Sequence, residues 1–572
     1  MKRFLLLSKK AVCVLLALML TAAFIPAVYA AEPEDTLIEG TFTMTTFDGF
    51  DPGEQTYYYS DSYFMSSGKE SNAHLRTMSA ALIFQIKGTS DTPEETFGST
   101  LSKIGFQDIT TYDMEHTSLD TIGIVLAHKS VHEKEVVAVA LRGDKYEHEM
   151  AANMISGTEG DIKAFADAEA LVESRVCAYL AEHGITSAKY WVTGYSRSGA
   201  VANLFGRELN KEPERFLTGD DDIYVYTMEA ANGSADDSVY ENIHNIIDRR
   251  DLIPYLYPKE WGLHSNGIPA YIGTADDTVM LKCFDMINES HMADYQEIKL
   301  VDYLSDLTSF LSQNLSRETF AEEVGLPLSR VLNIYFDLDE VQRSEVLPFF
   351  QQALSGMMQD AMMIPTVLGA LIEPESQESI GNLYTLIVKY LDKTAEENGK
   401  PVDDESYEII KAALRTMLEP LLPVIHADFF ATIDKGNGED PDNVPLYHIL
   451  TLAGNLENVL QNHFNYHVFN ELKLMDSYYT ERKDGIIRGD ADGDGKATVL
   501  DVTAIQRRLA NLPVATFNEK AADVDGDGLD ITDATKIQRK LAELDDPYHI
   551  GEFVSDNPQP TQDEYELPSI RN

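Results

Sequence analysis

The stretch WVTGYSRSGAVAN, residues 191–203, decides the fold expected of this chain. The residues 190–193 predict a short strand, and the alanine-containing segment 200–209 predicts a helix soon after it. Between them lies Ser196, with one glycine two residues before it and another three residues after it. Small neighbours permit a sharp turn that lifts the serine hydroxyl clear of the sheet, and the helix N-terminus behind it favours developing negative charge. Ser196 is therefore the predicted nucleophile.

Segments around this turn alternate between strand and helix patterns. The runs 121–129 (TIGIVLAHK) and 135–141 (EVVAVAL) are β-branched and apolar, which predicts strands. The long alanine-rich segment 161–183 predicts a helix, and 223–228 predicts another strand. Strand–helix–strand alternation predicts an α/β fold, with a parallel sheet that has helices on both faces.

The turn at Ser196 resembles the nucleophile elbow of the fungal-type (class 3) lipase family, which usually reads Gly-His-Ser-x-Gly-Gly-Ala. Ser198 stands where that family has the first of its two adjacent glycines. VALRGDKYEHEMAAN (139–153) is similar to the family's strand and Arg-Gly turn, where the oxyanion hole is built. The resemblance implies an α/β-hydrolase sheet and acyl transfer on carboxylic esters. It also implies that the backbone amides of Asp144 and Arg197 hold the oxyanion.

The acid of a triad should follow the nucleophile in this fold. NIID (245–248) ends a predicted strand, and DLIPYLYPKEWGL (251–263) follows it. In the resembling family an aspartate just before an aliphatic-Pro pair is the triad acid, which points to Asp251. Asp248 is the alternative.

The histidine base should follow the acid and lie on a loop that returns to the serine. His463, in QNHFNYHVFNELKLMD, is favoured because this segment resembles the last loop and helix of secreted bacterial relatives. Long helical patterns between residues 296 and 460 then form a cap inserted into the hydrolase. His291, in SHMADY, is the alternative base and would end the hydrolase near residue 310. The less favoured candidates are His264 and His467.

The C-terminal segment contains an internal repeat. DADGDG begins at residue 490 and DVDGDG at residue 523, and the helices that follow read DVTAIQRRLA and DATKIQRKLA. The first loop places oxygen ligands at positions one, three, five and twelve, with a glycine at six, as calcium loops do. The second reaches its last aspartate at position eleven, one residue short. The predicted calcium ligands are Asp490, Asp492, Asp494, the carbonyl of Lys496, Asp501, Asp523, Asp525, Asp527 and Asp533.

This tandem resembles a dockerin, a small all-α, EF-hand-like module that attaches an enzyme to a cohesin on a scaffolding protein. The resemblance implies Ca²⁺ in the module, no cofactor for catalysis, and a cohesin partner. The expected organisation is a signal peptide at 1–30, a loop-rich lead-in at 31–72, an α/β-hydrolase core at 73–295, a helical cap or insertion at 296–460, the end of the hydrolase at 461–485, the dockerin-like domain at 486–546 and an acidic disordered tail at 547–572.

Charge and the N-terminal segment predict the compartment. The formal net charge of −50 should repel nucleic acid and anionic membranes, so neither is an expected partner. Lysines and an arginine within residues 1–10, the apolar run 11–25 and the small residues in VYA (28–30) predict a cleaved signal peptide, with an uncleaved anchor as the alternative. After cleavage no transmembrane anchor is expected, and the protein should be secreted.

Two functions are compatible with these features. The favoured one is a secreted serine ester hydrolase, acting on a lipid or on a plant-wall ester and attached to a scaffold through its dockerin. The alternative is a catalytically inactive hydrolase fold that serves as a binding or structural component of the same complex.

Overall fold

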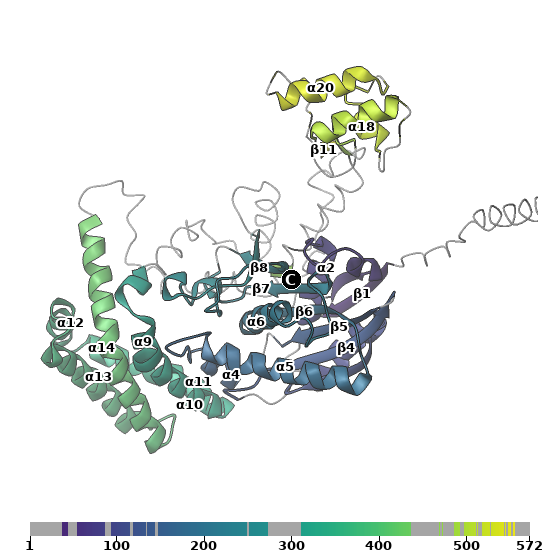
Figure 1. Cartoon of the computed structure of the whole chain (residues 1–572). Coiled ribbons are helices and arrows are strands. Elements are labelled where there is room, and N and C mark those ends of the chain that lie inside the picture. Colours follow the sequence, from purple (N-terminus) through teal and green to yellow (C-terminus); the bar gives the residue numbers. More distant parts are fainter. Residues whose placement is uncertain are drawn as a thin grey trace, which may run out of the picture.

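The computed structural model describes the chain in several stretches (Figure 1). These are residues 37–43, 54–85, 93–114, 118–132, 134–142, 147–248, 251–272, 310–435, 468–469, 472, 486–491, 497–510, 512, 517–526, 528–542, 544, 547–548, 550 and 553–554.

The strands are β1 (Ile38–Thr43), β2 (Glu54–Tyr59), β3 (Gln107–Tyr112), β4 (Ile124–Val131), β5 (Lys134–Leu141), β6 (Ala188–Tyr195), β7 (Ile223–Met228), β8 (Tyr240–Asp248), β9 (Gly267–Ile272), β10 (Ile486–Ile487) and β11 (Phe553–Val554). The helices are α2 (Ala73–Ile83), α3 (Pro93–Lys103), α4 (Glu147–Ala152), α5 (Lys163–His183), α6 (Arg197–Lys211), α9 (Arg317–Thr319), α10 (Leu326–Asp337), α11 (Glu340–Met358), α12 (Met363–Ile372), α13 (Gln377–Asn398), α14 (Asp404–Lys435), α18 (Val499–Leu509), α19 (Glu519–Ala522) and α20 (Ile531–Leu541). Short helical turns are η1 (Asp61–Phe64), η2 (Asp220–Asp222), η3 (Ile253–Tyr255), η4 (Lys259–Trp261) and the π-helical η5 (Phe320–Gly325).

A seven-stranded sheet with the order β3-β4-β5-β6-β7-β8-β9 forms the centre of the hydrolase part. β3, β4 and β5 pair antiparallel, and β5 through β9 pair parallel. Nearly every residue of β5, β6 and β7 is buried, because helices cover both faces of a parallel sheet. The predicted α/β-hydrolase fold is confirmed, but its sheet is mixed and not wholly parallel as expected. The predicted strands 121–129 and 135–141 form the antiparallel pair β4–β5, because the few residues between them leave no room for a crossover helix.

Side chains of each strand alternate between two apolar cores. Val136, Ala138 and Trp191 lie in the core shared with α2, β1 and β2. Val137 and Val192 lie in the opposite core, shared with α5 and α6 (Figure 1). Alternate side chains along a strand therefore point to opposite faces of the sheet, and each face packs against a different set of helices.

The lead-in is more regular than the expected loop-rich segment. β1 and β2 form an antiparallel pair, and η1 follows them. The rings of Tyr57, Tyr59 and Phe64 are buried in the hydrolase core. Tyr57 and Tyr59 lie at alternate positions of β2 and therefore share its buried side, whereas Tyr58 between them is exposed.

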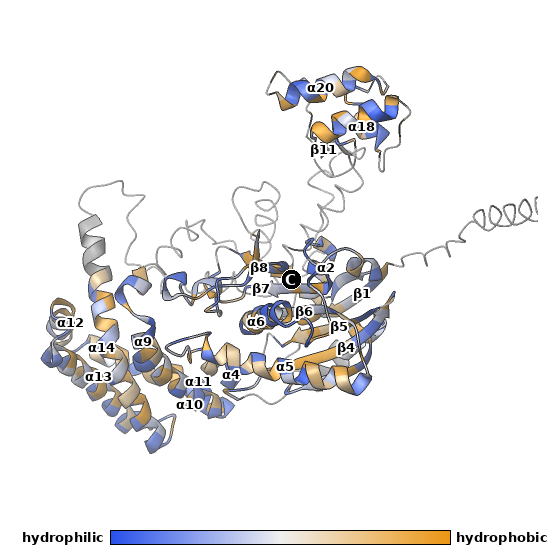
Figure 2. Ribbon diagram, in the orientation of Figure 1, coloured by the Kyte–Doolittle hydropathy of each residue, from blue (hydrophilic) through white to orange (hydrophobic). Residues whose placement is uncertain are grey.

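The helical region, α10 to α14, packs on the hydrolase part beside α4 (Figures 1 and 2). The guanidinium of Arg317 donates to the backbone carbonyls of Ser156, Gly157, Glu159, Gly160 and Asp161 at 2.8–3.4 Å. The indole of Trp261 also donates to the carbonyl of Leu315 at 3.1 Å. These contacts join the start of the helical region to the loop before α5 and to η4.

Within the described stretches, no helix is both long and apolar enough to span a bilayer. In the C-terminal module, α18 and α20 pack together around a small apolar core that includes Val502, Ile505, Val524 and Ile537.

Candidate functional site

Ser196 occupies a strained turn between β6 and α6. Its backbone has φ 57° and ψ −123°, a conformation that a residue with a Cβ adopts only when its surroundings enforce it. The amide of Ser196 donates to the carbonyl of Met228 at 2.8 Å, which fixes the turn against the end of β7. The structure thus confirms the sharp strand-to-helix turn predicted at Ser196.

Two glycines make this turn possible. A Cβ on Gly194 would lie 2.2 Å from the carbonyl oxygen of Ser198, far inside contact distance. A Cβ on Gly199 would lie 3.0 Å from both the carbonyl oxygen of Met228 and the Cβ of Ala230. The helix therefore starts close to both neighbouring strands only because these positions have no side chain.

Ser198, the departure from the family pattern, has a structural role. Its hydroxyl accepts a hydrogen bond from the amide of Tyr195 at 2.9 Å. It donates to the carbonyl of Leu141 at 3.1 Å or to that of Tyr195 at 2.9 Å. The side chain is fully buried, so it links the turn to the end of β5 and is compatible with the elbow.

The two predicted oxyanion donors are the backbone amides of Arg197 and Asp144. Arg197 is the first residue of α6, and its guanidinium donates to Asn153 Oδ1 at 3.0 Å and to the carbonyl of Thr121 at 3.2 Å. The guanidinium is thus bonded to Asn153 and Thr121, and the predicted oxyanion contact involves the main-chain amide alone. Asp144 lies outside the described residues.

The strand end that precedes Asp144 is held by a buried ion pair. Arg142 Nη2 lies 2.5 Å from Glu149 Oε1, and both side chains are almost completely buried. Burial raises the pKa of Glu149, and the charges of Arg142 and Arg197 act against that rise. Arg142 Nη1 also donates to the carbonyl of Asp113 at 3.0 Å.

Asp251, the predicted acid, is completely buried just beyond the end of β8. Its Oδ1 accepts a hydrogen bond from the amide of Ile253 at 2.9 Å. Its own amide donates to the carbonyl of Asp248 at 3.0 Å. Asp248, the alternative acid, is the last residue of β8 and is also buried.

Glu229 is a functional candidate that the sequence analysis did not identify. It directly follows β7, is completely buried, and has a positive φ of 49°. Both of its carboxyl oxygens accept from the amide of Asp248, at 2.8 and 3.1 Å, and its side chain hydrogen-bonds that of Asp251. Burial, followed by the nearby charges of Asp251 and Asp248, raises the pKa of Glu229 well above its usual value.

Two carboxyl groups in contact inside a dry site cannot both ionise. The raised pKa of Glu229 favours its protonated form, which is the form that can donate a hydrogen bond to Asp251. The available sequence signal was an acidic residue at the end of the apolar run IYVYTM (223–228).

Of the predicted bases, only His264 lies within the described residues. His463, His291 and His467 lie outside the described residues. His264 is described, and its backbone forms a bridge with Ser234. Soon after His463, Val468, Phe469 and Leu472 are buried in the core that contains α2, and Thr77 Oγ1 donates to the carbonyl of Leu472 at 3.4 Å.

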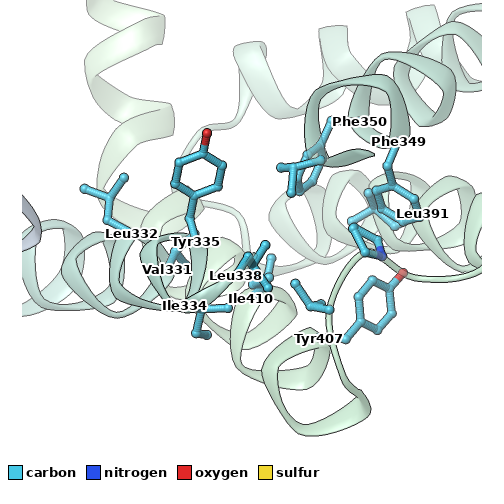
Figure 3. A pocket seen from close by; sticks show the side chains of 13 residues that line it. Val331, Leu332, Ile334, Tyr335, Leu338, Phe349, Phe350, Leu391, Tyr407 and Ile410 are labelled. Atoms are coloured by element: carbon cyan, nitrogen blue, oxygen red, sulfur yellow. The ribbon is translucent and has the colours of Figure 1, made fainter. Parts of the chain in front are cut away.

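An apolar pocket lies in the helical region, lined by side chains of α10, α11, α13 and α14 (Figure 3). Phe349, Leu391 and Tyr407 line it together with Val331 and Ile334. None of its lining residues belongs to the candidate triad.

Five of the predicted calcium ligands lie within the described residues, two in the first loop and three in the second. Asp490 and Asp501 of the first loop are buried, and Asp501 Oδ2 accepts from the amide of Thr498 at 2.6 Å. Oxygen atoms of Asp523, Asp525 and Asp533 in the second loop lie within 4.8 Å of one another. Carboxylate oxygens are the ligands that Ca²⁺ prefers. The remaining predicted ligands, Asp492, Asp494, Lys496 and Asp527, lie outside the described residues.

Residues 488–542 match the Dockerin type I domain family, which confirms the predicted module. A comparison with curated proteins finds no match.

Similar solved structures are lipases. One is described as a model for interfacial activation in lipases from a fungal lipase–inhibitor complex, with 18% identity, 35% of this chain and 79% of that chain covered, and a TM-score of 0.28. A second is described as a triacylglycerol lipase whose catalytic centre is a serine protease triad, with 20% identity, 35% and 79% coverage, and a TM-score of 0.27. A third is lipase II from Rhizopus niveus, with 17% identity, 36% and 83% coverage, and a TM-score of 0.27.

Proposed function

We propose that this protein is a secreted serine hydrolase of carboxylic esters that attaches to a cohesin-bearing scaffold through its dockerin. The observation that carries the catalytic part is the strained turn at Ser196, next to a strand end where Glu229 and Asp251 are paired and buried. Strain at a non-glycine residue persists only where the surrounding structure maintains it, and such positions are concentrated at active sites.

The proposed reaction is acyl transfer through Ser196. Its hydroxyl oxygen attacks the ester carbonyl carbon, and the hydroxyl proton passes to the histidine base. The backbone amides of Arg197 and Asp144 stabilise the oxyanion. The histidine then gives its proton to the leaving alcohol, and the acyl group stays on Ser196. A water molecule attacks this acyl group and gives a proton to the histidine, which returns it to Ser196 as the carboxylic acid leaves.

His463 is the proposed base, with His291 as the alternative. The burial of Val468, Phe469 and Leu472 against the hydrolase core supports His463, because the chain returns to that core within a few residues of it. In this assignment the region from 296 to 460 is an insertion between acid and base.

Glu229 acts in this scheme as a positioning residue. Its protonated carboxyl donates to Asp251, while the amide of Asp248 holds Glu229 itself in place. Asp251 can then accept a hydrogen bond from the histidine with its remaining capacity and fix the imidazole tautomer.

The experiment that tests this function is hydrolysis of p-nitrophenyl esters of graded acyl length by the full chain. Ser196→Ala and His463→Ala should each lower kcat by about 10³-fold or more, and His291→Ala should leave it near the wild-type value. Loss of activity with His291→Ala instead would transfer the base to that residue. A fluorophosphonate probe that does not label Ser196 would favour the inactive binding component.

The substrate class follows from the same experiment. A preference for long acyl chains would support a lipid ester, and activity only on acetyl or feruloyl esters would support a plant-wall ester. The proposed partner is tested separately, because cohesin binding should require Ca²⁺ and should be lost when Asp490 is replaced by alanine.

A further inference from the structure

The two halves of the dockerin are repeats, so each is a structural reference for the other. α18 and α20 both begin with a capping box, formed by Thr498 with Asp501 and by Asp530 with Asp533. Both helices contribute to one apolar core. Because the two helices start in the same way, the calcium loops before them can be compared residue by residue.

The second loop is one residue shorter than the first, and its carboxylates accept hydrogen bonds within the loop. Asp533 accepts from the amide of Val524 at 3.1 Å with one oxygen and from that of Asp530 at 2.9 Å with the other. Asp523 accepts from the amides of Gly526 at 2.8 Å and Gly528 at 3.0 Å. The first and last acidic residues of this loop are therefore already bonded to loop amides.

A lysine lies among these carboxylates. Lys536 Nζ forms an ion pair with Asp525 and lies 3.7 Å from Asp533 Oδ1. Only 13% of its side chain is exposed, compared with 17% for Asp525 and 0% for Asp533. Its ammonium group thus lies in the sheltered position where the acidic side chains of the second loop converge.

The first half has no charge at the helix position that corresponds to Lys536. In the aligned helices DVTAIQRRLA and DATKIQRKLA, the residue that corresponds to Lys536 is Ala504, whose side chain is buried. The repeat therefore differs at this point in both loop length and local charge.

The second loop does not fit a calcium ion as it stands. Ca²⁺ binds through carboxylate oxygens at 2.3–2.6 Å, and in this loop the carboxylates of Asp525 and Asp533 lie against the ammonium of Lys536 instead. An ion entering here would meet the ammonium of Lys536 in a site with little solvent to screen the repulsion.

We propose that the ammonium of Lys536 takes the place of calcium in the second loop, so that the dockerin binds one calcium ion, in its first loop. The three N–H donors of an ammonium group satisfy carboxylates that would otherwise repel one another. The second half then keeps its loop structure without an ion, whereas the first half depends on one.

The test is the calcium stoichiometry of the full chain, measured by equilibrium dialysis after removal of bound metal with a chelator. The wild type should bind one ion per chain. Lys536→Ala, which installs the residue of the first half, should bind two, and Lys536→Arg, which keeps the charge, should bind one. Circular dichroism checks that the variants retain their helix content.

Loop-specific variants assign the ion. Asp490→Ala in the wild-type chain should abolish binding, and Asp523→Ala should leave one ion bound. Two ions in the wild type, or a single ion in Lys536→Ala, would overturn the proposal. Retained binding in Asp490→Ala together with loss in Asp523→Ala would also overturn it, because the ion would then occupy the second loop. None of these outcomes depends on ester hydrolysis.

Discussion

The hydrolase sheet buries its apolar side chains, whereas the helical region leaves many of its apolar side chains exposed. β5, β6 and β7 bury nearly all of their residues, and the cores on the two faces account for their apolar side chains. In α11, by contrast, Leu347, Leu354 and Met358 are 63%, 53% and 64% exposed. These residues recur at intervals of seven and four, so they form a row along the helix.

The difference indicates where the structure tolerates change. A sheet buried on both faces has no space for an added atom, because protein interiors are close-packed. A helix with exposed apolar residues loses little free energy of folding when those residues change. Substitutions of the same chemical kind in the two regions should therefore give results that differ in size and even in sign.

The largest expected contrast is between two glycines. Gly194→Ala should destabilise the protein by roughly 3 kcal/mol or more, because the new Cβ would overlap the carbonyl of Ser198. Gly369→Ala, inside α12 and with no atom within 4 Å of the new Cβ, should stabilise by about 0.5–1 kcal/mol. Urea denaturation of both variants measures the two values. Equal destabilisation would contradict the distinction between the regions.

Two leucines give the next largest contrast. Leu204→Ala removes a side chain that is 1% exposed in α6 and should cost about 2–5 kcal/mol. Leu354→Ala removes one that is 53% exposed in α11 and should cost less than about 1 kcal/mol. Thermal unfolding monitored by circular dichroism provides the comparison, and a large loss for Leu354→Ala would show that this helix face is covered in solution.

The pH dependence of stability should also differ between the regions. Burial and the neighbouring Glu173 raise the pKa of Glu169, a residue of α5, to about 8. The folded state therefore binds more protons than the unfolded state, and stability falls as pH rises from about 4.5 to about 8. Glu169→Gln should flatten this fall in urea denaturation series across that range. An unchanged slope would exclude Glu169 as its cause.

In the helical region the dependence should be reversed. The ammonium of Lys389 holds the pKa of Asp360 below its usual value, so its contribution is lost as pH falls through the acid range. Because 59% of the Lys389 side chain is exposed, solvent screens this ion pair, and the effect is the smallest one expected. Comparing acid unfolding of Asp360→Asn with that of the wild type tests it, and a shift in the alkaline range instead would contradict it.

The sequence predicted the hydrolase sheet because its signals are local. The runs that became β4 and β5, the long helix α5 and the turn at Ser196 each have a pattern within a few residues. β1 and β2 were missed although Tyr57 and Tyr59 alternate along the strand, because polar residues surround them.

Contacts between distant segments could not be predicted in the same way. Glu229 meets Asp251 only because β7 and β8 are neighbours in the sheet and their ends coincide. Lys536 reaches Asp525 because the helix after the second loop turns its side chain back over that loop. A loop motif specifies ligand positions, but it contains no information about side chains that return from beyond it.

The attachment of the helical region through Arg317 has a consequence for how this protein can change over generations. The guanidinium contacts five carbonyls of the segment 156–161, and each carbonyl is present whatever side chain that position has. The junction itself therefore places no demand on the side chains of this segment, whereas the positive φ of Gly157 and Gly160 and the ion pair of Asp161 with Arg207 constrain it for other reasons. Arg317 itself is required by the junction, since a lysine offers three donors from one point and cannot span the same set of acceptors.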